Sequence, residues 1–251
     1  MLSAAQKAAV DFPLKVPEAF VARMQYGNPD DPLLTQVLPV SAELNSPVKY
    51  SKDPLQEAHY NPAPGIVHKY RNRVLLIVSP NCAINCRYCF RRHFPYQENQ
   101  QSKQQWKKTL DYIRNKPEIN EVIYSGGDPL AANDHFLTWL TTEIETIGHI
   151  KRLRIHTRLP VVIPSRVDNQ LVTWLSSSRL KTIMVLHINH ANEVSEPLRD
   201  RLRSLQQAGI TLLNQAVLLK GINDTADAQV ALNEAVFEAG ILPYYLHVLD
   251  K

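Results

Sequence analysis

The chain carries three cysteines, and all of them lie in one short stretch, at Cys82, Cys86 and Cys89. Thiolates are soft ligands that suit zinc or an iron–sulfur cluster. A structural zinc site needs a fourth donor, and His93 completes a C-x3-C-x2-C-x3-H pattern. Three cysteines without a fourth instead suit a four-iron cluster that keeps one iron open. We favour the cluster, because structural zinc usually ties small domains together and this stretch follows a predicted strand of a large repeated unit.

Composition narrows the class of protein. The 251 residues carry 28 basic and 24 acidic side chains, a net charge of +4 that allows an anionic partner without demanding one. No apolar run is long enough to cross a bilayer, and the N-terminal MLSAAQKAAVDF lacks the apolar core of a secretion signal. Three clustered thiols do not make a disulfide framework. We therefore expect a cytoplasmic protein without a membrane partner.

The elements that position the cysteines are predicted from hydrophobic periodicity. Residues 1–66 are rich in proline and irregular, with one short helix expected at 17–26. Beyond them, short apolar runs alternate with amphipathic stretches, which predicts parallel strands covered by helices. Both an open doubly wound sheet and a barrel fit this alternation. The expected strands are 73–78, 121–125, 152–156, 182–188, 211–219 and 243–250, and the expected helices are 103–115, 136–147, 169–177, 196–209 and 225–240.

Every expected strand contributes polar or ligand-type residues, at or after its end in five strands and within the strand at 211–219, where Gln215 interrupts the apolar pattern. Because the carboxyl ends of parallel strands meet at one rim, these residues predict a site there. They are Cys82 after the first strand, SGGDP (125–129) after the second, His156 and Arg158, then His187 and Asn189, then Gln215, and finally Asp250.

The motif C-x3-C-x2-C, with Tyr88 before the last cysteine and a glycine pair after the second strand, resembles radical S-adenosylmethionine (SAM) enzymes. The resemblance implies a partial (β/α)6 TIM-like barrel at 67–251 behind an N-terminal extension at 1–66. It also implies a [4Fe-4S] cluster on the three cysteines. S-adenosylmethionine would chelate the fourth iron and yield a 5′-deoxyadenosyl radical.

A closer resemblance extends over nearly the whole chain. The segments NPDDPLLTQVLP, DPLQE, HKYRNRVLL, SGGDPL, HINHANE and NQAVLLKGIND resemble lysine 2,3-aminomutases, and CRYCFRRHFPY is similar to the branch that serves elongation factor P. These isomerases use pyridoxal 5′-phosphate (PLP) to convert (S)-α-lysine to (R)-β-lysine, which a separate ligase attaches to elongation factor P. The resemblance also implies an electron donor such as flavodoxin and permits a homo-oligomer.

Site roles follow from the same resemblance. Arg91 matches the arginine that holds the substrate carboxylate, and Asp250 matches a carboxylate that receives the ε-ammonium group. Arg87 and Arg92 could instead form a nucleic-acid patch, but no interleaved aromatic residues support one. The S-adenosylmethionine contacts would be Tyr88, Ser125, Gly126, Gly127, Asp128, Arg158, His187 and Gln215, and the PLP contacts Arg73 and Lys69.

One departure from the family pattern is serious. Family aminomutases bind PLP through a lysine beyond the last barrel strand, whereas this chain ends at Lys251, one residue after Asp250. We therefore assign no catalytic residue. Either PLP is held without its covalent anchor or the chain is a fragment truncated before the PLP-lysine segment, and we favour the fragment. Two alternatives stay open: an aminomutase for another amino acid such as glutamate, which Asp250 would repel, and a non-catalytic, zinc-stabilised binding module.

The cysteine pattern predicts metal content directly. Anaerobic reconstitution should load about four irons per chain, and alanine at Cys82, Cys86 or Cys89 should abolish loading. Iron and zinc analysis of the purified protein measures this. One tightly bound zinc with no iron uptake would contradict the cluster.

Overall fold

A computed structural model describes residues 2–45, 50–99 and 101–249 of the chain. Its strands form one seven-stranded sheet in sequential order, antiparallel between the first two strands and parallel thereafter. Among the described residues, no helix combines the length and apolar character that crossing a membrane requires. The strands are β1 (Ile66–Tyr70), β2 (Arg73–Ser79), β3 (Glu121–Gly126), β4 (Arg152–Thr157), β5 (Lys181–His187), β6 (Thr211–Val217) and β7 (Leu242–His247).

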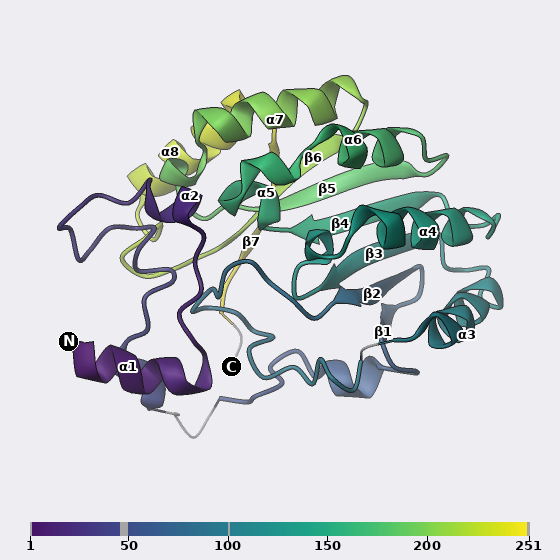
Figure 1. Ribbon diagram of the computed structural model, residues 1–251, viewed down its shortest axis with the longest axis horizontal. Coiled ribbons are helices and arrows are strands. Elements are labelled where there is room, and N and C mark those ends of the chain that lie inside the picture. The colour runs from purple at the N-terminus through teal and green to yellow at the C-terminus, as the bar shows by residue number, and fades with distance from the viewer. Residues whose placement is uncertain (1, 46–49, 100, 250–251) are drawn as a thin grey trace.

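The strand order separates the two architectures that the sequence left open. A doubly wound sheet reverses its strand order at a switch point, whereas here each strand lies beside its neighbour in sequence and helices cover one face (Figure 1). This winding confirms the predicted partial barrel. The main covering helices are α3 (Lys103–Arg114), α4 (Asp134–Glu145), α6 (Asn169–Ser176), α7 (Glu196–Gln207) and α8 (Ala226–Glu238), with short α5 (Leu159–Val162) after β4.

Local sequence explains where these helices begin and end. The side chains of Ser102, Asn133, Asp168, Ser195 and Thr225 each accept a hydrogen bond from a backbone N–H in the first turn of the helix that follows, which satisfies a donor that the helix itself cannot. Two of the helices, α7 and α8, are followed by glycines with φ near +75° (+79° at position 209 and +71° at 240), the left-handed conformation that ends helices.

The N-terminal region is more ordered than the sequence indicated. Helix α1 (Leu2–Asp11) was not predicted, although its four alanines favour a helix. Helix α2 (Glu18–Val21) is shorter than expected, and β1 was missed because so short a run becomes a strand only by pairing with β2. The last strand ends at His247, three residues before the predicted end at 250, and Asp250 and Lys251 lie outside the described residues. The division at residue 66 stays a prediction, and apolar side chains on its N-terminal side share the main core (Phe20, Leu33, Val37).

The two faces of the sheet have opposite character. Residues such as Leu76, Tyr124 and Ile155 are fully buried under the helices. Alternate residues point to the other face, and the strand register sets them in cross-strand rows. One row joins Ile123, Arg154 and Ile183, and a later one joins His187 and Gln215. The inner face is therefore mixed, with polar side chains such as Arg154, His187 and Gln215 beside aliphatic ones, while the fully buried core lies on the helix-covered face.

The buried face gives a test of the fold. Ile155→Ala removes a fully buried side chain and should lower the free energy of unfolding by about 2–5 kcal/mol, because the cavity only partly collapses. Val230→Ala, on a side chain that is 61% exposed, should change it by less than about 0.5 kcal/mol. Urea denaturation of both variants measures the difference. Equal costs would contradict the assignment of the core.

Candidate active site

The cysteine loop that follows β2 is held by the N-terminal segment. Lys15 Nζ donates to the carbonyl oxygen of Cys82 at 2.6 Å. Arg87 and Arg92 both bind the Glu43 carboxylate, Arg92 at 2.6 Å. One carboxylate therefore fixes two arginines of the loop, and the basic side chains considered for a nucleic-acid patch are instead paired within the protein.

The three cysteines are free thiols, each partly buried. Burial is the main cause that raises the pKa of Cys82, and it raises the pKa of Cys89 to about 11. Iron coordination would displace these protons, since a coordinated thiol is deprotonated. Among the described residues, no group of three or more His, Cys, Asp or Glu is placed to hold a single ion. A cluster does not need such convergence, because each thiolate binds a different iron.

The glycine pair is required by backbone packing. A Cβ atom at Gly127 would lie 2.6 Å from the carbonyl oxygen of Asn81, and one at Gly126, where φ is +125°, would lie 2.4 Å from that of Ser79. The Gly127 N–H donates to Ser79 O at 2.7 Å, so the end of β3 lies directly against the start of the cysteine loop. The sequence motif thus has a structural cause in addition to the cofactor contact that the resemblance implies.

Asp128 is fully engaged inside the protein. Its carboxylate accepts hydrogen bonds from Thr157 Oγ1 at 2.7 Å and from the backbone N–H groups of Arg158, Leu159 and Leu130 at 2.8 to 3.0 Å. Burial raises the pKa of this carboxyl group, and the hydrogen bonds oppose that rise. These contacts join the ends of β3 and β4, and a contact between Asp128 and the cofactor stays a prediction.

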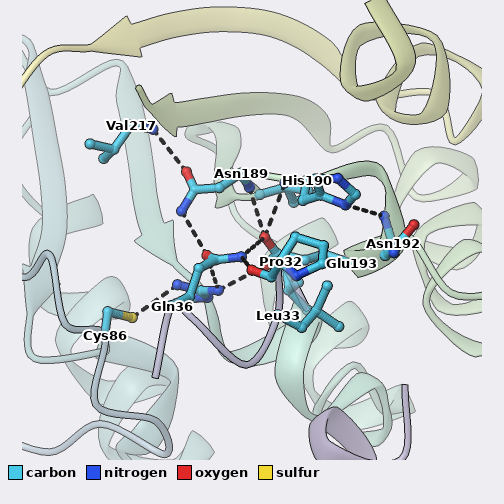
Figure 2. A network of polar contacts seen from close by, with 12 residues as sticks. Pro32, Leu33, Gln36, Cys86, Asn189, His190, Asn192, Glu193 and Val217 are labelled. Carbon is cyan, nitrogen blue, oxygen red and sulfur yellow. Dashed lines mark hydrogen bonds and ion pairs between the residues drawn. The ribbon is translucent and has the colours of Figure 1, made fainter. Parts of the chain in front are cut away.

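Arg158 connects Cys86, Gln36 and Glu193, three of the residues labelled in the polar network of Figure 2. Its guanidinium donates to Cys86 Sγ at 3.0 Å, contacts the Tyr88 hydroxyl, and binds Gln36 Oε1 and Glu193 Oε2, each at 2.9 Å. The Arg158 side chain is 6% exposed and that of Glu193 is 0% exposed. Three segments therefore meet beside Cys86, a predicted cluster ligand. Arg158 comes from the segment after β4, Glu193 from the segment after β5 and Gln36 from the N-terminal segment.

The inner face at this rim carries neutral imidazoles. Burial, assisted by Arg158, lowers the pKa of His187 to about 3, and the Gln215 amide contacts the His187 ring. Burial also holds the pKa of His156 well below its usual value. Among the described residues, His156 Nε2 and Arg158 Nε are buried without a hydrogen-bond partner. A bound molecule with polar atoms could satisfy both, so the site fits a polar cofactor such as S-adenosylmethionine.

Arg91 already has a carboxylate partner. Its Nε and Nη2 atoms donate to Glu57 at 2.9 and 2.6 Å, and its Nη1 atom donates to Ser125 Oγ at 2.7 Å and to Gly126 O at 3.3 Å. These contacts use four of the five N–H groups of a guanidinium. A substrate carboxylate could bind Arg91 through two hydrogen bonds only if it displaced one of these partners. Arg91 and Glu57 also line a surface cavity of about 380 Å³.

The remaining predicted contacts lie elsewhere. Arg73 is the first residue of β2. At about 3.3 Å per residue, it lies about 20 Å from Ser79, the end of β2 that leads into the cysteine loop. Its guanidinium is half-buried 4.2 Å from the Tyr70 ring and has no carboxylate partner among the described residues, which suits a phosphate. Lys69 is exposed and donates to Leu55 O at 3.3 Å. Asp250 lies outside the described residues.

Sequence reasoning missed the residues that hold the others in place. Gln36, Glu43, Glu57 and Glu193 are all partners of arginines at the rim. Three of them lie in segments that carried the family resemblance: Gln36 in NPDDPLLTQVLP, Glu57 in DPLQE and Glu193 in HINHANE. The available signal was a polar side chain, a carboxylate or an amide, within a segment that resembles the family. The spacing of these residues in the sequence did not identify the arginines that they bind.

Comparison with known proteins agrees with this fold. Residues 76–230 match the model of the radical SAM superfamily. The chain is 54% identical over 250 residues to an L-lysine 2,3-aminomutase of Escherichia coli, covering 100% of this chain and 73% of the relative. It is 52% identical to that of Haemophilus influenzae, covering 96% and 71%. A solved structure described as native anSMEcpe with bound AdoMet and Kp18Cys peptide matches with a TM-score of 0.56 at 14% identity, covering 71% of this chain and 51% of that one. The last match shows the fold alone.

The glycine contacts generate a test of the site. Gly127→Ala should push the start of the cysteine loop aside, because its Cβ meets backbone atoms at 2.6 to 2.9 Å. We expect a loss of about 1–3 kcal/mol of stability and reduced iron loading. Gly148→Ala, where nothing lies within 4 Å, is the matched control. Iron analysis and denaturation measure both effects, and normal iron loading in Gly127→Ala would show that the loop tolerates the shift.

Proposed function

Because the chain belongs to the L-lysine 2,3-aminomutase family of radical SAM enzymes, we propose that this isomerase converts (S)-α-lysine to (R)-β-lysine for the β-lysylation of elongation factor P. The observation that carries the proposal is the gathering of three cysteines, Arg158 and His187 at one rim of a polar inner face. The E. coli and H. influenzae relatives are both named L-lysine 2,3-aminomutase. The link to elongation factor P rests on the resemblance of CRYCFRRHFPY alone.

The reaction explains why such a site is needed. Moving an amino group from C2 to C3 requires removal of an unactivated hydrogen from C3, and no side-chain base can remove it because it is not acidic. When bound, the cluster and S-adenosylmethionine supply radical chemistry for that step, and PLP holds the migrating nitrogen. The protein supplies binding, orientation and exclusion of water.

Residues of this chain have proposed roles in that binding. Cys82, Cys86 and Cys89 would hold the cluster, and Tyr88, Ser125, the glycine pair, Asp128, Arg158, His187 and Gln215 would surround S-adenosylmethionine. Arg73 is the candidate for the PLP phosphate because it is a half-buried cation on the inner strand β2 without a carboxylate partner among the described residues. Exposed Lys69 would be a peripheral contact. A low-potential electron donor such as flavodoxin would reduce the cluster, and a ligase would take the product.

Arg91 would receive the substrate carboxylate, with Glu57 as its partner when the substrate is absent. Exchange of one carboxylate for another would keep the buried guanidinium paired. The displaced Glu57 carboxylate would then have to turn into the cavity that both residues line. Asp250 would receive the ε-ammonium group. A lysine zwitterion carries both charges and could therefore span the two residues, whereas glutamate would place its side-chain carboxylate against Asp250.

The direct test is turnover by the reconstituted protein. Anaerobic protein with cluster, S-adenosylmethionine, PLP and dithionite should form β-lysine from L-lysine, with chiral chromatography to assign the product. Elongation factor P and its ligase should then accept that product. Preferential turnover of glutamate would show that glutamate, and not lysine, is the substrate. A protein that binds zinc and turns over neither amino acid would contradict the proposed enzymatic activity.

Substrate choice depends on Asp250 in particular. Loss of one partner of a buried charge pair costs about 2–5 kcal/mol. Allowing for partial solvation, Asp250→Asn should lower lysine turnover at least about tenfold, which corresponds to about 1.4 kcal/mol. Asp200→Asn, on a side chain that is 60% exposed, should leave turnover unchanged. The measurement is the rate of β-lysine formation at matched iron content. Wild-type turnover in Asp250→Asn would remove the main argument for lysine.

A further inference from the structure

Arg158 is placed to act on the cluster through a cysteine. Its Nη1 atom lies 3.0 Å from Cys86 Sγ. A guanidinium is always charged, so this contact combines an N–H···S hydrogen bond with a positive charge beside one thiolate. Hydrogen bonds to sulfur and local charge are two of the factors that set the reduction potential of an iron–sulfur cluster.

The position of Arg158 is fixed by neighbours from separate parts of the chain. Glu193 Oε2 binds the opposite nitrogen, Nη2, at 2.9 Å, and Gln36 Oε1 binds the same nitrogen at 2.9 Å. Glu193 is held in turn, because its Oε1 atom accepts from the backbone N–H groups of Asn189 and His190 at 2.9 and 3.1 Å and from Gln36 Nε2 at 3.1 Å. Figure 2 shows this chain of contacts leading from the loop after β5 to Cys86.

The charges in this network have opposite effects at the sulfur. The Arg158 guanidinium is the nearer group and favours added negative charge on the cluster. The Glu193 carboxylate lies on the far side of the guanidinium and opposes that effect, because it partly neutralises the cation. In a buried site, where water does not screen these charges, both effects should be measurable.

We propose that Arg158 is a positioning residue that raises the reduction potential of the cluster through Cys86, and that Glu193 and Gln36 set the strength of that effect. The proposal rests on the proposed function, since it requires the three cysteines to hold the cluster. The couple concerned is the one-electron reduction of the cluster from the 2+ to the 1+ state by a low-potential donor. The added electron makes the cluster and its thiolates more negative, so a hydrogen-bonded cation stabilises the reduced form.

The experiment is a reductive titration with dithionite and redox mediators, followed by electron paramagnetic resonance, first without S-adenosylmethionine. Arg158→Gln should make the cluster harder to reduce by at least about tenfold in the equilibrium, equivalent to about 59 mV for one electron. Arg158→Lys, which keeps the charge, should lie between Arg158→Gln and wild type. Glu193→Gln should shift the potential the opposite way, toward easier reduction.

The matched control is Arg154→Gln on β4, the strand that ends directly before Arg158. Arg154 is also largely buried, at 10% exposure, and is paired with Glu121 at 2.7 Å, but it contacts no cysteine among the described residues. Its loss should leave the potential at the wild-type value. A general effect of breaking a buried ion pair would instead shift Arg154→Gln and Arg158→Gln alike, and would overturn the proposal.

The remaining outcomes separate this inference from the proposed function. A wild-type potential in cluster-loaded Arg158→Gln, combined with weaker binding of S-adenosylmethionine, would assign Arg158 to that ligand and overturn the inference alone. Shifts of Arg158→Gln and Glu193→Gln in the same direction would also overturn it. If Arg158→Gln loads no iron, the potentials of the other two variants test the inference. A wild-type potential in both Arg158→Lys and Glu193→Gln would then overturn it. Wild-type protein that loads no cluster would overturn the proposed function and this inference together.

Discussion

The cysteine loop has little regular structure of its own, and its shape depends on hydrogen bonds from distant segments. Backbone polar groups that leave water must find partners. Here the N–H groups of Asn85 and Arg87 donate to Lys15 O and Gln36 O, each at 2.9 Å. The N-terminal segment therefore supplies bonds that a strand or helix would otherwise supply, and it lies against the barrel beside the loop (Figure 1). For this reason the extension is structurally part of the site, whatever its boundary as a domain.

The second common feature is that each buried arginine has a carboxylate from another element. Arg91 binds Glu57, Arg158 binds Glu193 and Arg154 binds Glu121, with no side chain in these pairs more than 10% exposed. Such pairs contribute little net stability, because removing two charges from water costs about as much as their attraction returns. Breaking one is nevertheless costly, since the remaining charge is left unpaired. Their value here is geometric: each pair fixes two segments at one distance and one orientation.

The barrel separates stability from chemistry by the alternation of its strands. Leu153 and Ile155 face the helices and are fully buried, while Arg154 and His156, which alternate with them along β4, face the inner side. A substitution on one face can therefore change stability with little effect on the site. The inner face also keeps its histidines neutral, because burial lowers the pKa of both His156 and His187. Neutral imidazoles can accept or donate hydrogen bonds to a cofactor without adding charge beside Arg158.

Much of this molecule is determined by local sequence. The expected strand from 152 to 156 is observed as Arg152–Thr157, and the expected helix from 169 to 177 as Asn169–Ser176, because periodicity and caps are short-range signals. The cysteine spacing and the glycine pair likewise predicted a site at one rim, and the structure places the glycine pair against the start of the cysteine loop. Strand β1 and the full extent of the N-terminal helices escaped prediction, since pairing and packing partners decide whether such short segments become regular.

What only the tertiary structure decided is which charges meet. Gln36 and Arg158 are 122 positions apart, and Glu57 and Arg91 are 34 apart, so no local pattern could pair them. Arg91 was interpreted from the sequence as a substrate contact, and only the fold places Glu57 against its guanidinium. Periodicity determines which face of a strand a side chain occupies. Its partner depends on how distant loops pack, and burial makes that pairing obligatory for a charge.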